Sequence, residues 1–122
     1  MGNNGNLTAS FDERGLGNEN IDYTLTGDAA ATWACFNGGG KHPQAANKET
    51  ETFPVVEETS FEPKNGRVVA SFSTDAPTTT FTCPFGQQLR LASISYTDLV
   101  LTDTTNDVST NLADVSRTFF AV

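Results

Sequence analysis

The stretch that decides the fold is Ile21 to Cys35, which reads IDYTLTGDAAATWAC. Its larger apolar side chains, Tyr23 and Trp33 among them, all fall on odd positions, and most of the positions between them are threonine or aspartate. Because successive side chains of a β-strand point to opposite faces, this alternation predicts a strand with one buried face. A single long strand bent at Gly27 is favoured, and a hairpin turning at Gly27-Asp28 is the alternative.

Strand-like segments follow along the rest of the chain, at 7–11, 50–61, 67–73, 80–85, 88–102 and 108–122. Pro54 confines its strand to a sheet edge or a break, because proline has no N–H to donate to a neighbouring strand. In 88–102 the apolar phase slips twice, which two β-bulges or a corner near Thr97-Asp98 would explain. Asn65-Gly66 predicts a tight turn, and 103–107 predicts a hairpin loop.

These segments predict an all-β fold, an antiparallel immunoglobulin-like β-sandwich of about seven to nine strands. Residues 7–122 would form one domain, and residues 1–6, which are mostly glycine and asparagine, a flexible N-terminal segment. Threonine, which suits a pleated and half-exposed surface, supplies 18 of the 122 residues.

The composition is acidic, with 7 lysines and arginines against 15 aspartates and glutamates and a net charge of -8. Nucleic acids and anionic lipid surfaces attract cationic side chains, so neither is an expected partner. No apolar run approaches the roughly 20 residues that a membrane-spanning helix requires.

The two cysteines, Cys35 and Cys83, are interpreted as one disulfide. They form no C-x-x-C motif and no zinc-binding cluster, and two free thiols of a cytosolic protein are the alternative. A disulfide implies export, although the chain opens with Met1 and a glycine- and asparagine-rich run rather than a signal peptide. The simplest reconciliation is a mature, secreted segment preceded by an added Met1.

Several short motifs together are similar to a known group of proteins. They are A-x-W-x-C-x-N-G-G-G at 31–40, P-x-x-A-N-K at 43–48, N-G-R-V at 65–68, C-P-x-G-Q at 83–87 and ISYTDLVLTDTT at 94–105. The pattern resembles small secreted, mostly uncharacterised β-sandwich proteins of actinobacteria and some fungi that carry one cysteine pair. The resemblance spans roughly residues 16 to 106, and it implies export and a Cys35–Cys83 bridge, with no activity to transfer.

The glycine-rich loop after Cys35 is the first candidate for ligand contact, because loops on a rigid sheet commonly carry recognition. The candidate residues are Phe36, Asn37, Gly38, Gly39, Gly40, Lys41 and His42. Phe36 has the opposite phase to Trp33 and is expected to be exposed beside this loop. His42, the only histidine, is interpreted as a solvated loop residue, since no G-x-S-x-G motif accompanies it.

Calcium is the one cofactor considered, and no other is expected. Asp103 and Asp107 place carboxylates at both ends of a loop, as a hard cation requires, but the EF-hand pattern is absent. A hairpin turn without metal is the alternative interpretation.

The favoured function is therefore a secreted, non-catalytic module that binds an extracellular protein or glycan through its surface. The alternatives are a small extracellular hydrolase and an inhibitor of an extracellular enzyme.

Overall fold

The computed structural model of the chain describes residues 1–37 and 47–121, and these residues contain seven strands and no helix. All pairings between strands are antiparallel. The strands are β1 (Thr8–Glu13), β2 (Ile21–Phe36), β3 (Lys48–Phe61), β4 (Val68–Ser73), β5 (Gln88–Asp103), β6 (Val108–Asn111) and β7 (Val115–Thr118). β1 and β4 form one sheet, and β3, β2, β5 and β6 follow one another in the second, in which β7 also pairs with β5. The prediction of an all-β, antiparallel fold is confirmed.

β2 is one strand of 16 residues, as the unbroken alternation of Ile21 to Cys35 predicts, and the hairpin alternative is wrong. It pairs with β3 on one side and with β5 on the other. Gly27 lies where the pairing with β5 is irregular. A Cβ atom at this position would lie 2.7 Å from Leu99 Cδ2, so only glycine lets the two strands approach this closely.

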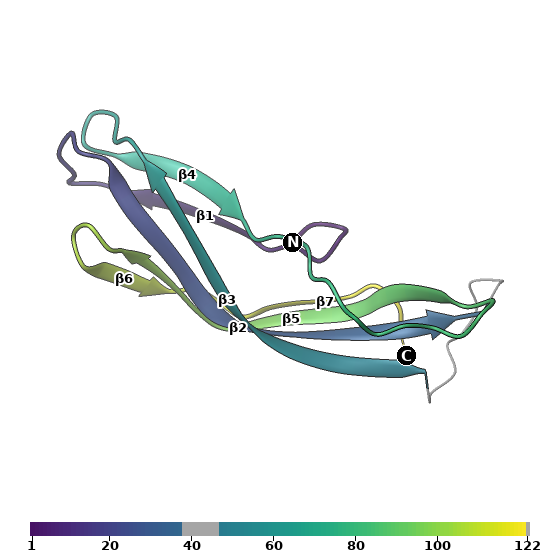
Figure 1. Cartoon of the computed structure of the whole chain (residues 1–122). Coiled ribbons are helices and arrows are strands. Elements are labelled where there is room, and N and C mark those ends of the chain that lie inside the picture. Colours follow the sequence, from purple (N-terminus) through teal and green to yellow (C-terminus); the bar gives the residue numbers. More distant parts are fainter. Residues whose placement is uncertain (38–46, 122) are drawn as a thin grey trace.

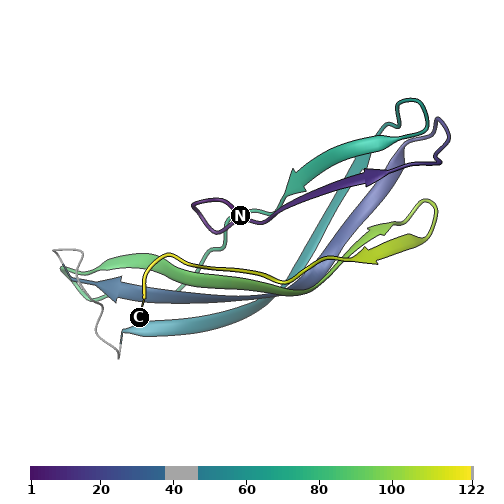
Figure 2. The same cartoon turned by 180° about the vertical axis from the view of Figure 1, so that it is seen from behind.

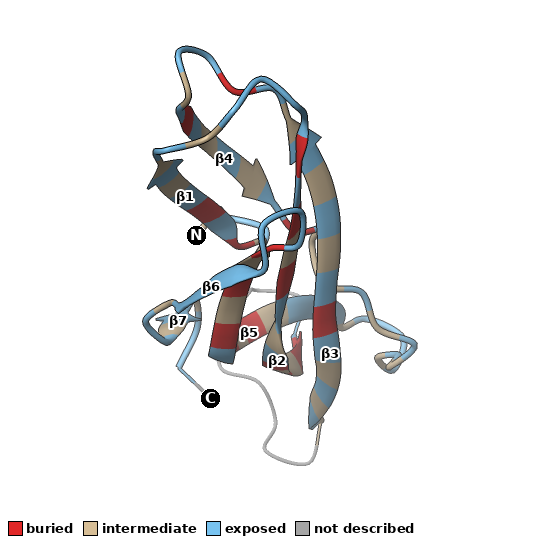
Figure 3. Cartoon of the chain, turned by 90° about the vertical axis from the view of Figure 1, so that its left-hand side faces the viewer, coloured by how far each residue is buried: buried red, intermediate tan, exposed pale blue. Residues whose placement is uncertain are grey.

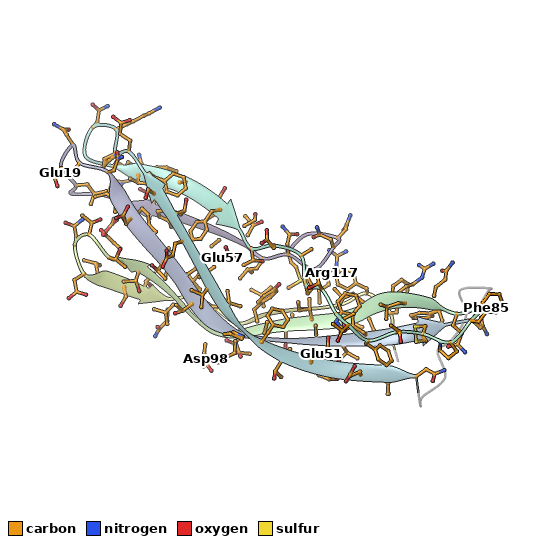
Figure 4. The ribbon with its side chains drawn as sticks, viewed as in Figure 1. Glu19, Glu51, Glu57, Phe85, Asp98 and Arg117 are labelled. Atoms are coloured by element: carbon orange, nitrogen blue, oxygen red, sulfur yellow. A yellow bond between two sulfur atoms is a disulfide. The ribbon has the colours of Figure 1, made fainter. Side chains whose placement is uncertain are left out.

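β5 contains the two β-bulges that its slipping apolar phase predicts. Thr32 faces Ser93 and Trp33 faces Leu91, which leaves Ala92 as an extra residue on β5. The second irregularity lies opposite Gly27, around Asp98, whose φ of 54° is unusual for a residue other than glycine. The long strands bend here, and Asp98 lies at the bend (Figures 1 and 4).

The main core lies between the two sheets and continues past the bend, where it includes Ala29, Ala31, Ile94 and Tyr96. β1 and β4 cover only the half of the bent sheet that carries β6 (Figure 2), and buried residues of both contact buried residues of β2 and β5. The buried residues of this core are Leu7, Ala9, Ile21, Tyr23, Leu25, Ala29, Ala31, Val55, Val68, Ile94, Tyr96, Leu99 and Leu101. Buried and more exposed positions alternate along the strands (Figure 3), which is why a period of two was visible in the sequence.

The other half of the bent sheet lies beyond the β1–β4 layer. The segment between β4 and β5 runs along this half toward the far end of the molecule (Figure 1), and none of residues 74–87 belongs to a strand. The strand predicted at 80–85 is therefore wrong.

Residues 1–6, predicted to be a flexible segment, are placed in a turn beside this region. Gly5 N donates to Gly2 O over 3.1 Å, and the buried Tyr96 hydroxyl donates to Gly5 O over 2.7 Å. Met1 packs against the main core. These contacts connect the N-terminal segment to β5, on the half of the sheet that β1 and β4 leave uncovered.

The β3–β4 connection is the tight turn that Asn65-Gly66 predicts. Both residues have positive φ, 54° and 72°, as the favoured two-residue hairpin turn requires. Just beyond it, Arg67 donates from Nε and Nη2 to the two carboxylate oxygens of Asp12, over 2.8 and 2.6 Å. The hydrogen bond from Arg67 lowers the pKa of Asp12 to about 2, with Arg14 acting in the same direction and burial acting against both. This ion pair joins β1 to the residue directly before β4.

Candidate functional site

A disulfide between Cys35 and Cys83 joins the end of β2 to the segment that precedes β5. The Cα atoms are 5.6 Å apart, and 48 positions of sequence separate the two residues. The predicted disulfide is confirmed in the structure, and the alternative of two free thiols is wrong. The bond is compatible with an extracellular location, because disulfides persist in oxidising compartments.

Next to the disulfide, residues 84–87 form a turn that exposes Phe85. Gln87 N donates to Pro84 O over 3.1 Å, and Gly86 has a φ of 86°, as the third residue of a type II turn requires. The relative exposure of Phe85 is 107%, so none of the described residues covers its ring. Figure 4 places Phe85 at the extreme end of the molecule.

The turn is tied to the sheet by contacts on both sides of the disulfide. Cys35 N donates to Asn47 O over 2.9 Å, and Asn47 Nδ2 donates to Gln87 Oε1 over 3.0 Å. We call Asn37, Asn47 and residues 83–87 the disulfide end of the molecule. Its backbone is fixed by one covalent bond and by hydrogen bonds from both flanks, so Phe85 is an exposed aromatic ring on a positioned turn.

Phe36 is buried, which corrects the expectation that its phase leaves it exposed. Its relative exposure is 3%, and it packs with Ala34 and Ala92 on the face of the sheet opposite to the main core. The C-terminal segment covers it: the Phe120 ring lies 4.9 Å from the Phe36 ring, and the Arg90 guanidinium lies over both. The sequence pattern of β2 alone could not reveal this cover, because Phe120 is distant in the sequence.

The remaining residues of the predicted contact loop divide into two groups. Asn37 is exposed and lies at the disulfide end. Gly38, Gly39, Gly40, Lys41 and His42 lie outside the described residues.

Asp103 and Asp107, the calcium candidates, have different environments. Asp103 is 3% exposed, and its two oxygens accept hydrogen bonds of 2.8 Å from the backbone N and the Nδ2 of Asn106. Asp107 is exposed and has a φ of 57° in the predicted hairpin loop between β5 and β6. Among the residues that the structure describes, no three histidine, cysteine, aspartate or glutamate side chains form a group that could hold a metal ion. The carboxylate of Asp103 stabilises the turn between β5 and β6 by accepting these two hydrogen bonds.

Asp103 also belongs to an acidic cluster between the sheets that the sequence did not predict. The Tyr23 hydroxyl donates to Glu13 Oε1 over 2.6 Å. Burial raises the pKa of Glu13, and the nearby Asp103 carboxylate acts in the same direction, against the hydrogen bond from Tyr23. Burial also acts to raise the pKa of Asp103, but the hydrogen bonds from Asn106 outweigh it and lower that pKa. The two carboxyl groups thus differ in acidity.

The sequence contains a signal for the Phe85 turn that the strand pattern concealed. Phe81, Cys83 and Phe85 alternate like the inward side chains of a strand, and Phe81 and Cys83 are indeed partly buried. The run Pro84-Phe85-Gly86, however, is a turn signature, because glycine supplies the positive φ that a type II turn needs.

Comparisons with known proteins identify no relative: no family model, no curated protein sequence and no solved structure matches the chain. The resemblance to secreted actinobacterial and fungal proteins therefore stays a prediction. Within the described residues, no helix is long and apolar enough to cross a membrane.

Proposed function

We propose that this protein is a secreted, non-catalytic binding module that contacts an extracellular partner through its disulfide end. The observation that supports the proposal most directly is the full exposure of Phe85 on a fixed turn. Aromatic residues, phenylalanine among them, are enriched at the cores of protein–protein interfaces relative to the rest of the protein surface. Phe85 would enter an apolar cavity on a protein partner, with glycans as the other class to be tested.

The fixed backbone around Phe85 should give a higher binding affinity than a mobile loop of the same sequence would. A loop that is ordered only in the complex loses conformational freedom on binding, which weakens affinity. The Cys35–Cys83 bond and the Asn47–Gln87 hydrogen bond remove much of that loss in advance. The sequence-based proposal that residues 38–42 contact the ligand concerns residues outside the described part of the chain, and it stays a prediction.

We propose a secreted location on the basis of the disulfide and of the resemblance described above. For the fold, we propose a β-sandwich of the immunoglobulin-like kind. Two sheets that pack on a shared core support the sandwich. Their division into two and five strands departs from the four and three strands of a constant-type immunoglobulin domain.

Photo-crosslinking at position 85 tests the proposed contact. A benzoylphenylalanine in place of Phe85 should give a discrete adduct when the protein is incubated with intact producing cells and their medium. The same photoreactive residue in place of Glu58, which is exposed on β3, is the control. Adducts of equal pattern and yield at both positions would contradict the proposal, as would the absence of any adduct at 85.

A glycan array probed with the wild type and with Phe85→Ala separates the two partner classes. A protein adduct at position 85, together with no glycan signal that depends on Phe85, supports a protein partner. Glycan binding that Phe85→Ala abolishes would assign the disulfide end to sugar recognition instead.

A further inference from the structure

A groove separates the outer edge of β3 from the extended segment that follows β4, and Phe85 is not among its lining residues. It has a volume of about 580 Å³ and is lined by residues 51–57 of β3, by residues 74–80 and by Tyr96. Seven strand residues span about 20 Å at the rise typical of an extended chain. The groove is therefore long enough for an extended peptide of similar length and is within the size range of ligand sites.

One wall of the groove is a strand edge without a partner. Among the described residues, β3 pairs with β2 only, over 14 positions, whereas β6 and β7 on the opposite side of the sheet have four residues each. A long free edge presents unpaired N–H and C=O groups and is a template for an added strand. Pro54 removes one donor from β3 and leaves the remaining residues of the edge able to pair.

The side chains on the inner face of β3 alternate with the period of the strand. Phe53 and Val55 lie between two glutamates, Glu51 and Glu57, and all four are at least partly buried. Figure 4 shows the two glutamates along β3 on either side of its bend. An added strand would meet a central apolar pair with a carboxylate toward each end.

The negative charge of the groove determines which peptides could bind to it as an added strand. Glu51, Glu57 and Asp75 line it, and no lysine, arginine or histidine is among its described lining residues. Neither glutamate has an ion-pair or hydrogen-bond partner among the described residues. A second copy of β3 would place glutamates in this acidic groove, and like charges directly opposite each other on paired strands are destabilising. The same charges favour lysine or arginine at those positions.

We propose that this groove binds an extended polypeptide segment that carries lysine or arginine, added as a strand to the outer edge of β3. The basic side chains face Glu51 and Glu57, and the apolar residues between them face Phe53 and Val55. This site is separate from Phe85, so its test is independent of the function proposed above.

The probe is a capped, fluorescently labelled heptapeptide of sequence Lys-Thr-Val-Thr-Val-Thr-Lys. It reads the same in both directions, so it matches the groove in either strand orientation. Its inward positions are lysine, valine, valine and lysine, the complement of Glu57, Val55, Phe53 and Glu51. The control peptide replaces both lysines with glutamates and keeps the valines. Fluorescence anisotropy should show saturable binding of the lysine peptide, at least tenfold tighter than that of the control, and weaker binding at high salt.

Two double variants locate the site. Glu51→Gln with Glu57→Gln should weaken binding of the lysine peptide at least fivefold. Glu19→Gln with Glu58→Gln removes the same net charge from exposed positions outside the groove, and it should leave the affinity within twofold of the wild type. Equal losses in both variants would mean that only the overall charge attracts the peptide, which would overturn the proposal.

Backbone methylation tests the addition of a strand itself. In one form of the lysine peptide the threonines are N-methylated, and in the other the valines and lysines are. Alternate N–H groups of an extended chain point to opposite edges, so one form should lose binding and the other should keep it. Full binding by both forms, or loss by both, would contradict pairing along β3.

Discussion

Removing the Cys35–Cys83 disulfide should destabilise the protein by an amount that its loop length sets. The bond separates residues 48 positions apart. In the chain-entropy treatment, a closed loop of that size restricts the unfolded chain by about 4 kcal/mol at 25 °C. The free energy of unfolding of a small domain is about 5–15 kcal/mol, so the Cys35→Ala/Cys83→Ala variant should still fold but be much less stable.

Urea unfolding measures this loss. Trp33, the only tryptophan, packs against the main core and reports on unfolding by its fluorescence. With a denaturant dependence of about 2 kcal/mol per M, the midpoint of the variant should lie about 2 M below that of the oxidised wild type. The wild type treated with reductant should unfold near the variant, which separates the loss of the bond from the change of side chains. A variant with the midpoint of the oxidised wild type would refute the entropic argument.

Three further changes test contacts elsewhere in the fold. Gly27→Ala should destabilise the protein by about 1–3 kcal/mol in urea unfolding, since the new Cβ would lie 2.7 Å from Leu99 Cδ2 and 2.9 Å from a backbone oxygen of β5. Tyr96→Phe should cost about 1–3 kcal/mol in the same assay, because it leaves the buried Gly5 oxygen without its donor. The pKa of Glu13 is raised in the folded protein, so its protonated form stabilises the fold at a pH below the pKa that Glu13 has in the unfolded chain. This stabilisation is lost as the pH rises through the pKa of Glu13 in the folded protein. The melting temperature of Glu13→Gln, measured relative to that of the wild type, should therefore rise between pH 4 and pH 7. A difference in melting temperature that does not change with pH would contradict this sign.

The long strands were predictable because their information is local. The odd-position pattern of Ile21 to Cys35 fixed one face of β2, and the two slips of phase in 88–102 correspond to the bulges at Ala92 and near Asp98. Pro54 indicated an edge strand before any pairing was known, and β3 is at an edge. In each case a single residue or a period of two carries the physical constraint.

The parts that could not be predicted depend on which distant segments meet. Nothing in the residues of β1 and β4 shows that these strands pair with each other instead of joining the larger sheet. Phe36 is buried because Phe120, far along the chain, lies against it, and Glu13 and Asp103 approach only once the sheets are packed. The exposure of Phe85 is a different case, because two local signals compete. The alternation of Phe81, Cys83 and Phe85 indicates a strand, and the first two side chains are partly buried, whereas Pro84-Phe85-Gly86 indicates a turn.

The irregular segment after β4 links the disulfide, the groove and Phe85. β1 and β4 cover one half of the bent sheet, but beyond the bend residues 74–87 run alongside without pairing. Within the part of the chain that the structure describes, the outer edge of β3 is therefore unpaired and the groove is open. One end of this segment is fixed where Thr74 N donates to Leu7 O over 2.8 Å, and the other is fixed by Cys83. A folded variant without the disulfide should therefore bind the lysine peptide more weakly than the oxidised wild type, because one anchor of the groove wall is lost. Unchanged peptide affinity in that variant would show that the contacts at Thr74 hold the wall by themselves.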